Sequence, residues 1–342
     1  MALHIHLTQS EAPRDVQALR QVLQAVDPAA IRMLAVLGKT EGPASLEDRS
    51  RHEAHEEAAR VIEQAGGAEL LERSWRIFST GCEGIATPVC IAIADTGVVG
   101  QGAEAAEPGM AVGAARSAAV ADAERCTRSH VAIAADCVRQ AMANGGIAPQ
   151  DVDLVFVKSP IRQGTDGIGG QHARSTGASR GSAALGVAIA LGECDLASLP
   201  EDPVLSVPAF ASRTMAFSGT ETDCVEAIVF GRRKGGDRDW LVTQVVLRDL
   251  LDVDALKRIE RPAGFEPRLV FFKAGIPADG RLRGRRTTVL TSELPADKQL
   301  RAAASGFVAA IFGASDTFIS GGAEHQGPDG SCLCSILWQR GL

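Results

Sequence analysis

The sequence predicts an α/β fold built of α+β sandwich units, with three similar domains around a pseudo-threefold axis. With 342 residues, the chain is too long for a single hydrophobic core. Three times, an apolar segment leads into a lysine, and a serine in a glycine-rich turn follows some tens of residues later. The lysines recur at intervals of about 115 to 120 residues, the size of one small domain. The lysines are Lys39, Lys158 and Lys273, and the serines are Ser79, Ser218 and Ser320.

Shifts in composition predict where the units meet. Small residues dominate positions 100–109, and a polar, charged stretch covers positions 231–239. Both compositions are typical of exposed connections. We therefore expect repeat units at residues 1–103, 112–232 and 241–342.

Each unit shows a similar order of elements. The segments before the lysines are rich in β-branched and aromatic residues, which favours strands buried on both faces. Apolar residues at helical spacing predict amphipathic helices near each lysine, and a further strand follows each serine. We read each unit as a sheet with helices on one face. The predicted strands are 31–37, 152–157 and 269–272 before the lysines, and 89–94, 224–230 and 333–338 after the serines. The predicted helices are 55–64, 130–144 and 299–312.

The middle unit contains an additional glycine-rich stretch at positions 164–181. It does not match a P-loop or a dinucleotide-binding fingerprint, because no strand–GxGxxG–helix order surrounds it. We predict a mobile lid or substrate loop there.

Composition and charge exclude several classes of function. The net charge of −7 disfavours a nucleic-acid or membrane surface. The basic segment 281–286 carries no interleaved aromatic residues, so we interpret it as a packing or subunit contact. The amino terminus lacks the features of a signal peptide, and no apolar run could span a membrane. With scattered cysteines, a cytoplasmic protein with reduced thiols fits best.

Metal motifs are weak in this chain. Cys332 and Cys334 stand at C-x-C spacing without a second pair, which makes a poor zinc site. His4 and His6 are the nearest approach to an H-x-H motif, and an exposed strand is the simpler interpretation. An enzyme of the barrel type that needs a metal bound by an H-x-H motif is therefore disfavoured.

The repeated lysine and serine could perform acyl transfer. Burial at the end of a strand lowers the pKa of a lysine and makes the neutral amine available as a base. A serine in a glycine-flanked turn can present its hydroxyl while backbone N–H groups face a developing oxyanion. Single residues of either kind are usually structural, but three copies in one order favour Ser–Lys chemistry.

Arginines add a binding function. Ser50-Arg51 and Ser179-Arg180 follow the first two lysines, near predicted helix starts. The third unit has Lys298 at the comparable place, with Arg301 three residues on. A planar guanidinium suits a flat ring that bears carbonyl oxygens. A threefold site of this kind predicts a six-membered ring with alternating carbonyl and amide groups as the ligand.

The chain resembles the ring-opening amidohydrolases, the family of cyanuric acid hydrolase and barbiturase. The similarity runs through all three units. It is carried by GKTEG at 38–42, SRTMAFSG at 212–219, GRLRGRR at 280–286 and SGGAEHQGP at 320–328, and by the segment 179–193.

The resemblance implies metal-free hydrolysis of a cyclic imide by a homotetramer. Cyanuric acid would give carboxybiuret and then biuret; the alternatives are barbituric acid, giving ureidomalonate, or a non-catalytic small-ligand binder. Lys158 would be the base and Ser218 the nucleophile. The expected substrate-binding residues are Lys39, Arg51, Ser79, Gly81, Arg180, Gly219, Lys273, Lys298 or Arg301, Ser320 and Gly321.

The resemblance also implies a structural divalent cation, Mg²⁺ or Ca²⁺, bound largely by backbone carbonyls near the last motif. No cofactor is expected for the chemistry itself. The sequence offers no unambiguous acidic ligand there, and Glu324 and Asp279 are the candidates. The expected cation ligands are Ala323, Gln326, Gly327 and Gly330.

Overall fold

The computed structural model describes residues 2–43, 48–97, 107–161 and 169–341, and these residues form three four-stranded sheets besides a short hairpin. The chain builds each sheet in the order strand, helix, strand, helix, strand, strand. The first unit contains β1 (Leu3–Gln9), α1 (Gln17–Ala25), β2 (Met33–Thr40), α2 (Ser50–Glu72), β3 (Ser74–Thr80) and β4 (Val89–Asp95). The second contains β5 (Pro108–Ala119), α3 (Arg128–Gly145), β6 (Val152–Pro160), α4 (Gly169–Ala190), β7 (Thr214–Gly219) and β8 (Cys224–Lys234). The third contains β9 (Trp240–Leu247), α5 (Val253–Lys257), β10 (Phe265–Ala274), α6 (Ala296–Phe312), β13 (Phe318–Gly321) and β14 (Cys332–Arg340).

The three sheets share one topology. Their strand orders are β1-β4-β2-β3, β5-β8-β6-β7 and β9-β14-β10-β13. The second and third strands of each unit are parallel, and the fourth is antiparallel to the second. This repetition confirms the predicted fold class. Below we call the units A, B and C; the places where each begins and ends as a folding unit stay a prediction.

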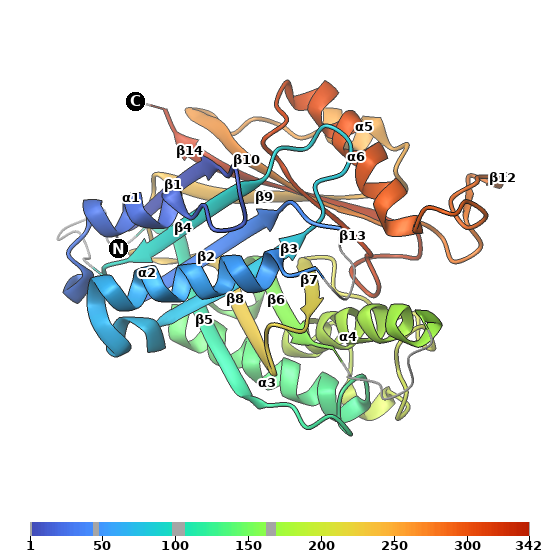
Figure 1. Ribbon diagram of the computed structural model, residues 1–342, viewed down its shortest axis with the longest axis horizontal. Coiled ribbons are helices and arrows are strands. Elements are labelled where there is room, and N and C mark those ends of the chain that lie inside the picture. Colours follow the sequence, from blue (N-terminus) through green and yellow to red (C-terminus); the bar gives the residue numbers. More distant parts are fainter. Residues whose placement is uncertain (1, 44–47, 98–106, 162–168, 342) are drawn as a thin grey trace.

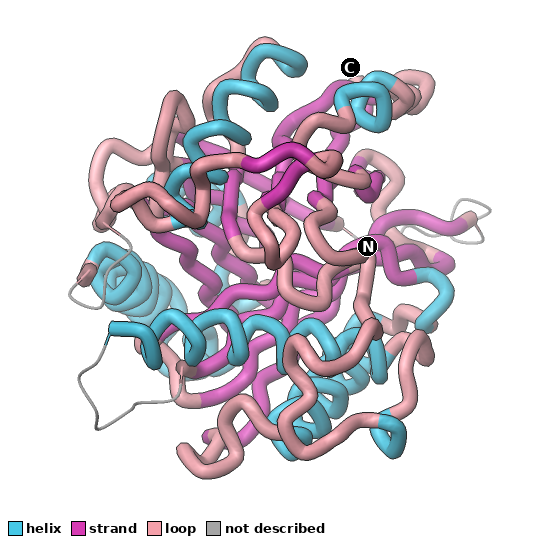
Figure 2. Tube along the Cα trace, turned by 90° about the vertical axis from the view of Figure 1, so that its right-hand side faces the viewer, coloured by secondary structure: helices cyan, strands magenta, loops and turns pink. Residues whose placement is uncertain are grey.

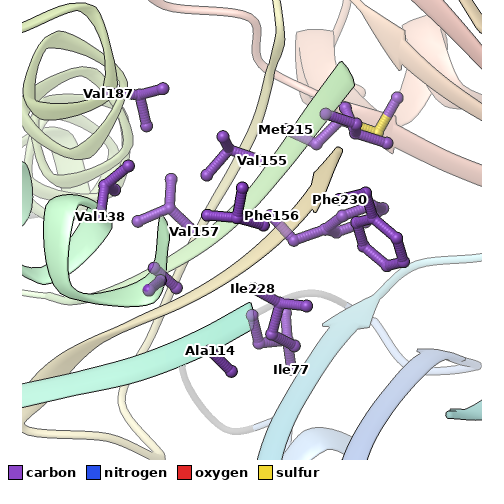
Figure 3. Packing of buried hydrophobic residues seen from close by; sticks show 14 of the residues in the cluster. Ile77, Ala114, Val138, Val155, Phe156, Val157, Val187, Met215, Ile228 and Phe230 are labelled. Carbon is purple, nitrogen blue, oxygen red and sulfur yellow. The ribbon is translucent and has the colours of Figure 1, made fainter. Parts of the chain in front are cut away.

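The sheets face inward and the long helices lie outside them. Figure 1 shows α1 and α2, α3 and α4, and α5 and α6 as three separate outer groups, and Figure 2 shows the strands running through the middle. The inner faces of all three sheets contribute to one buried apolar cluster, part of which Figure 3 shows around Phe156. The Phe156 ring packs against rings from units B and C, with centroids 5.0 to 6.1 Å apart. Mutual burial of these faces holds the units together.

The predicted strands and helices are present. The strands before the lysines are β2, β6 and β10, and those after the serines are β4, β8 and β14; the predicted helices lie within α2, α3 and α6. No helix among the described residues is long and apolar enough to cross a membrane. The basic segment forms an exposed hairpin of β11 (Arg281–Leu282) and β12 (Arg285–Arg286).

The glycine-rich stretch of unit B was predicted as a loop, and this is wrong for residues 169–181, which belong to α4. A glycine inside a helix costs about 1 kcal/mol, which packing can offset. Gly186 of the same helix shows how: a Cβ there would come within 2.5 Å of Ala134 Cβ on α3. Glycine thus lets the two helices approach closely. Gly164 and Gly167 lie outside the described residues.

Candidate functional site

The three lysines lie near the carboxyl ends of the second strands and are almost completely buried. Lys39, Lys158 and Lys273 are each at most 1% exposed. Burial is the largest cause of their lowered pKa values, which are about 7 for Lys39 and about 8 for Lys158. The pKa of Lys273 also lies well below its ordinary value because of burial. Amines with such pKa values can act as bases near neutral pH.

Units A and C each hold a lysine–serine pair. In the parallel ladders, Lys39 stands opposite Ser79 and Lys273 opposite Ser320. Lys39 Nζ lies 3.2 Å from Ser79 Oγ, and Lys273 Nζ lies 3.1 Å from Ser320 Oγ. Both lysines also donate to a carbonyl at 2.7 Å, of Thr80 and Ala216 respectively. These contacts place a base within hydrogen-bond reach of a hydroxyl.

Unit B is different. There the residue opposite Lys158 is Phe217, and Ser218 stands opposite Ser159. Because successive residues of a strand point to opposite faces, Phe217 faces the inner side, where it stacks on Phe156. Ser218 Oγ instead donates to the carbonyl of Thr176 on α4, at 3.1 Å. The structure therefore does not bring together the hydroxyl of Ser218 and the amine of Lys158, as the predicted dyad requires.

Lys158 has other partners. Its Nζ lies 2.5 Å from Glu221 Oε1 in a pair whose side chains are at most 4% exposed. It also donates to the backbone carbonyls of Phe78, at 2.9 Å, and Ser218, at 3.3 Å. Glu221 also forms an ion pair with Arg51, with 3.8 Å between Glu221 Oε2 and Arg51 Nε. After burial, the charge of Lys158 is the largest influence on Glu221, and it keeps the pKa of this carboxyl below its ordinary value. Lys158 is thus an ion-paired ammonium.

Three arginine–glutamate pairs join the units in a closed ring. Arg51 of unit A pairs with Glu221 of unit B, as described above. Arg180 of unit B binds Glu324 of unit C through two hydrogen bonds, of 2.9 and 2.8 Å. Arg301 of unit C binds Glu83 of unit A through two hydrogen bonds of 2.5 Å. Bidentate pairs fix the planes of the guanidinium groups.

This ring settles the third arginine. Arg301 is only 4% exposed and also binds Asp297 at 2.8 Å. Lys298 lies earlier in α6, and Glu83 binds Arg301 instead. Of the two residues that the sequence left open, Arg301 rather than Lys298 forms the pair with unit A.

The glycines beside the serines make room for this ring. Gly81 has φ +93°, and a Cβ there would approach the Arg301 guanidinium to 2.8 Å. A Cβ on Gly219 would come within 2.0 Å of the Glu221 carboxylate, and one on Gly321 within 3.0 Å of the Asp297 carbonyl oxygen. The N–H of Gly81 donates to the carbonyl of Thr40, so it serves the sheet rather than an oxyanion.

The expected cation site, whose ligands would be backbone carbonyls, stays a prediction, and several of its residues have partners within the protein. The side-chain oxygen of Gln326 accepts from the N–H of Ala216, and its nitrogen donates to the carbonyl of Gly322. The carbonyl of Ala323 accepts from the N–H of Gln326. Glycine at 330 packs against Pro277, and Gly327 lies beside Ser331. The two candidate carboxylates are engaged as well: Glu324 binds Arg180, and Asp279 accepts from the N–H of Arg281. Among the described residues, no group of three or more His, Cys, Asp or Glu side chains could hold a metal.

The sequence predicts no role for Glu83, Glu221 or Phe217, and it suggests Glu324 only as a cation ligand. One signal was available: Glu83, Glu221 and Glu324 each come four residues after the residue opposite the lysine. Aligned on these glutamates, Phe217 occupies the place of Ser79 and Ser320. The unit B serine is displaced by one residue.

The geometry defines a class of enzyme. Buried amines with lowered pKa values, hydroxyls in contact with them and a ring of guanidinium groups suit acyl transfer on a small carbonyl compound. The chain belongs to the amidohydrolase ring-opening proteins, whose family model matches residues 4–339. It is thus a hydrolase that acts on cyclic amides.

Individual relatives and solved structures agree with this assignment. A cyanuric acid amidohydrolase of Rhodococcus sp. is 32% identical over 98% of this chain and 95% of its own length. A cyclic amide hydrolase of Azorhizobium caulinodans is 31% identical over 98% and 99%. The crystal structure of cyanuric acid hydrolase from A. caulinodans superposes with a TM-score of 0.87, at 29% identity and 99% coverage of both chains.

Proposed function

We propose that this protein opens the ring of cyanuric acid or a closely similar cyclic imide, using a serine nucleophile and a lysine base. The observation that carries the proposal is the pair of lysine–serine hydrogen bonds within a ring of three arginines. The names of the relatives above support cyanuric acid as the first substrate to test.

The chemistry follows from the groups present. A neutral lysine takes the proton of the serine hydroxyl while Oγ forms a bond to a ring carbonyl carbon. The ring C–N bond breaks, and the lysine returns the proton to the departing nitrogen. Water then attacks the acyl-serine and gives its proton to the lysine, which passes it to the serine oxygen. The product is a ring-opened carboxylic acid, which ionises.

The three arginines can recognise the carbonyl oxygens of a cyclic imide. Three guanidinium groups arranged in a ring can donate to carbonyl oxygens spread around a flat ligand. No residue described here distinguishes a ring nitrogen from a ring methylene, so barbituric acid remains the second candidate.

A non-catalytic ligand binder on this fold is the alternative from another class. One observation favours it: in unit B, the serine hydroxyl binds the carbonyl of Thr176 and not the lysine. The hydrogen-bonded pairs of units A and C favour the enzyme.

A side-by-side assay tests the proposal. The purified chain is incubated with cyanuric acid, barbituric acid and N-methylated analogues, and ring opening is followed by liquid chromatography and by carbon dioxide release. We expect turnover of at least one unsubstituted ring, with biuret as the final product from cyanuric acid. Binding of a ring without turnover would establish the binder instead.

We also propose that the protein works as a homotetramer in the cytoplasm without a cofactor. Family resemblance is the support for the tetramer. Light scattering of the purified chain tests the tetramer. Activity after treatment with a chelator tests whether the chemistry needs a metal ion.

A further inference from the structure

We propose that Ser79 is the nucleophile and Lys39 the base, and that the Lys158–Ser218 pair of unit B is not catalytic. This inference rests on the proposed Ser–Lys chemistry and assigns it to a particular unit. Three features of the molecule lead to it.

The first feature is the register of unit B. A nucleophile must reach the base, and in a parallel ladder the residue opposite the lysine is the one that does. That residue is Phe217, which is 3% exposed and packed in the inner core. Ser218 belongs to the opposite face, where its hydroxyl binds the carbonyl of Thr176. The group of Ser218 that contacts Lys158 Nζ is its backbone carbonyl, at 3.3 Å, and not its hydroxyl.

The second feature is the ion pair of Lys158. In units A and C, the residues opposite the lysines on the antiparallel strand are Val89 and Leu333. In unit B this residue is Glu226, which is buried and bound to Arg116. With Glu221 at 2.5 Å as well, Lys158 has two buried carboxylates around it. These carboxylates favour the protonated amine and pair with it, which leaves Lys158 less free than Lys39 to accept a serine proton.

The third feature separates unit A from unit C. Phe217 lies over the amine of Lys273, with Nζ 4.6 Å from the ring centroid, so an aromatic ring of unit B covers the lysine of unit C. We find no such cover on Lys39 among the described residues. Both paired serines are buried. The aromatic cover on Lys273 is therefore what distinguishes the pair of unit C from the pair of unit A.

The surroundings of Lys39 suit a general base. Its pKa is about 7, because burial and Arg301 lower it. A base with a pKa near the working pH is half neutral and still holds the transferred proton. Arg301, held by Glu83 and Asp297, lies against Gly81, two residues after Ser79, where a reacting carbonyl can be polarised. The charged or titratable groups that act on Lys39 are Arg301, Cys82, Glu83, Arg51 and Lys273.

Two measurements on the full chain test the assignment. The first uses a small alkyl fluorophosphonate, which forms a bond from an activated serine oxygen to phosphorus with loss of fluoride, and peptide mapping by mass spectrometry locates the label. This readout does not depend on which ring the enzyme opens. We expect the label on Ser79. A label on Ser218 or Ser320, or none, would overturn the proposal.

The second measurement compares Ser79→Ala, Ser218→Ala and Ser320→Ala in the ring-opening assay, with folding checked by circular dichroism. We expect kcat to fall about 10³-fold or more for Ser79→Ala. Ser218→Ala is expected within about threefold of wild type, because only a hydrogen bond to α4 is lost. If Ser79→Ala does not fold, Ser79→Gly, which also lacks the hydroxyl, gives the same comparison. Loss of turnover in Ser218→Ala with Ser79→Ala active would overturn the proposal. A wild-type chain that takes the label at Ser79 but opens no ring would overturn only the choice of substrate.

Discussion

Units A and B have the same strands in the same order, yet their lysines have opposite surroundings. Lys39 faces a serine across the ladder and an apolar residue on its other side, and its amine binds the serine hydroxyl. Lys158 faces Phe217 and Glu226, and its amine binds Glu221. A repeated backbone can therefore be kept while the contacts of its lysine change from one copy to another. Three lysines and three serines in the sequence are not three equivalent pairs.

Replacing Lys39 or Lys158 by methionine should give the largest difference in kcat between units A and B. Lys39→Met removes the proposed base and should lower kcat by about 10³-fold or more, a typical loss for a general base. Lys158→Met removes one half of a buried ion pair and should lower stability, with folded protein keeping a kcat within about tenfold of wild type. The cost of breaking such a pair is about 3–5 kcal/mol. Steady-state kinetics and urea unfolding of both variants check this; equal loss of kcat in both would contradict it.

Phe217→Ser tests whether the side chain opposite Lys158 determines the difference. The change removes a buried aromatic ring, so we expect the free energy of unfolding to fall by about 3–5 kcal/mol. It also places a hydroxyl opposite Lys158. Phe217→Leu is the matched control, since it removes the ring without adding a hydroxyl. Fluorophosphonate labelling at position 217 in the first variant would show that register alone separates the units.

Substitutions in the arginine–glutamate ring should have a smaller effect, on KM. Glu83→Gln weakens a bidentate contact and frees Arg301, so we expect KM to rise about 10-fold to 100-fold, the worth of a charged hydrogen bond. Glu221→Gln loosens Arg51 as well, but its carboxylate also binds Lys158. Glu266→Gln, in an exposed pair with Arg261, is the control and should leave KM unchanged. Unaltered KM in Glu83→Gln would remove the proposed role of the ring in binding.

The pH dependence is the mildest test. The pKa of Lys39 is about 7, and that of Lys158 is about 8. A base works only when neutral, so kcat/KM should rise with pH and level off above the pKa of the base. We expect a midpoint near 7, with about a tenfold fall for each pH unit below it. A midpoint that shifts downward in Glu221→Gln but not in Glu83→Gln would assign the base to Lys158.

Much of the fold was readable from the sequence, because buried strands and amphipathic helices have local patterns. The three lysines and serines and two of the arginines were found in the same way. The position of Ser218 relative to Lys158 was not, because register depends on pairing between distant strands. Arg301 was left open against Lys298 for a similar reason, since its partner Glu83 lies in another unit. Residues 169–181 were misread because their glycines suggested a loop, whereas packing against α3 stabilises a helix.

A crystal structure of the Ser79→Ala variant with cyanuric or barbituric acid bound tests the central claim most directly. Our account predicts a ring carbonyl carbon about 3–3.5 Å from the position of the missing Ser79 oxygen, the distance of a reactive complex. It also predicts that the ring's other oxygens face Arg301 and Arg51. A ring bound with its carbonyl carbon beside Ser218, and with Phe217 displaced, would contradict it.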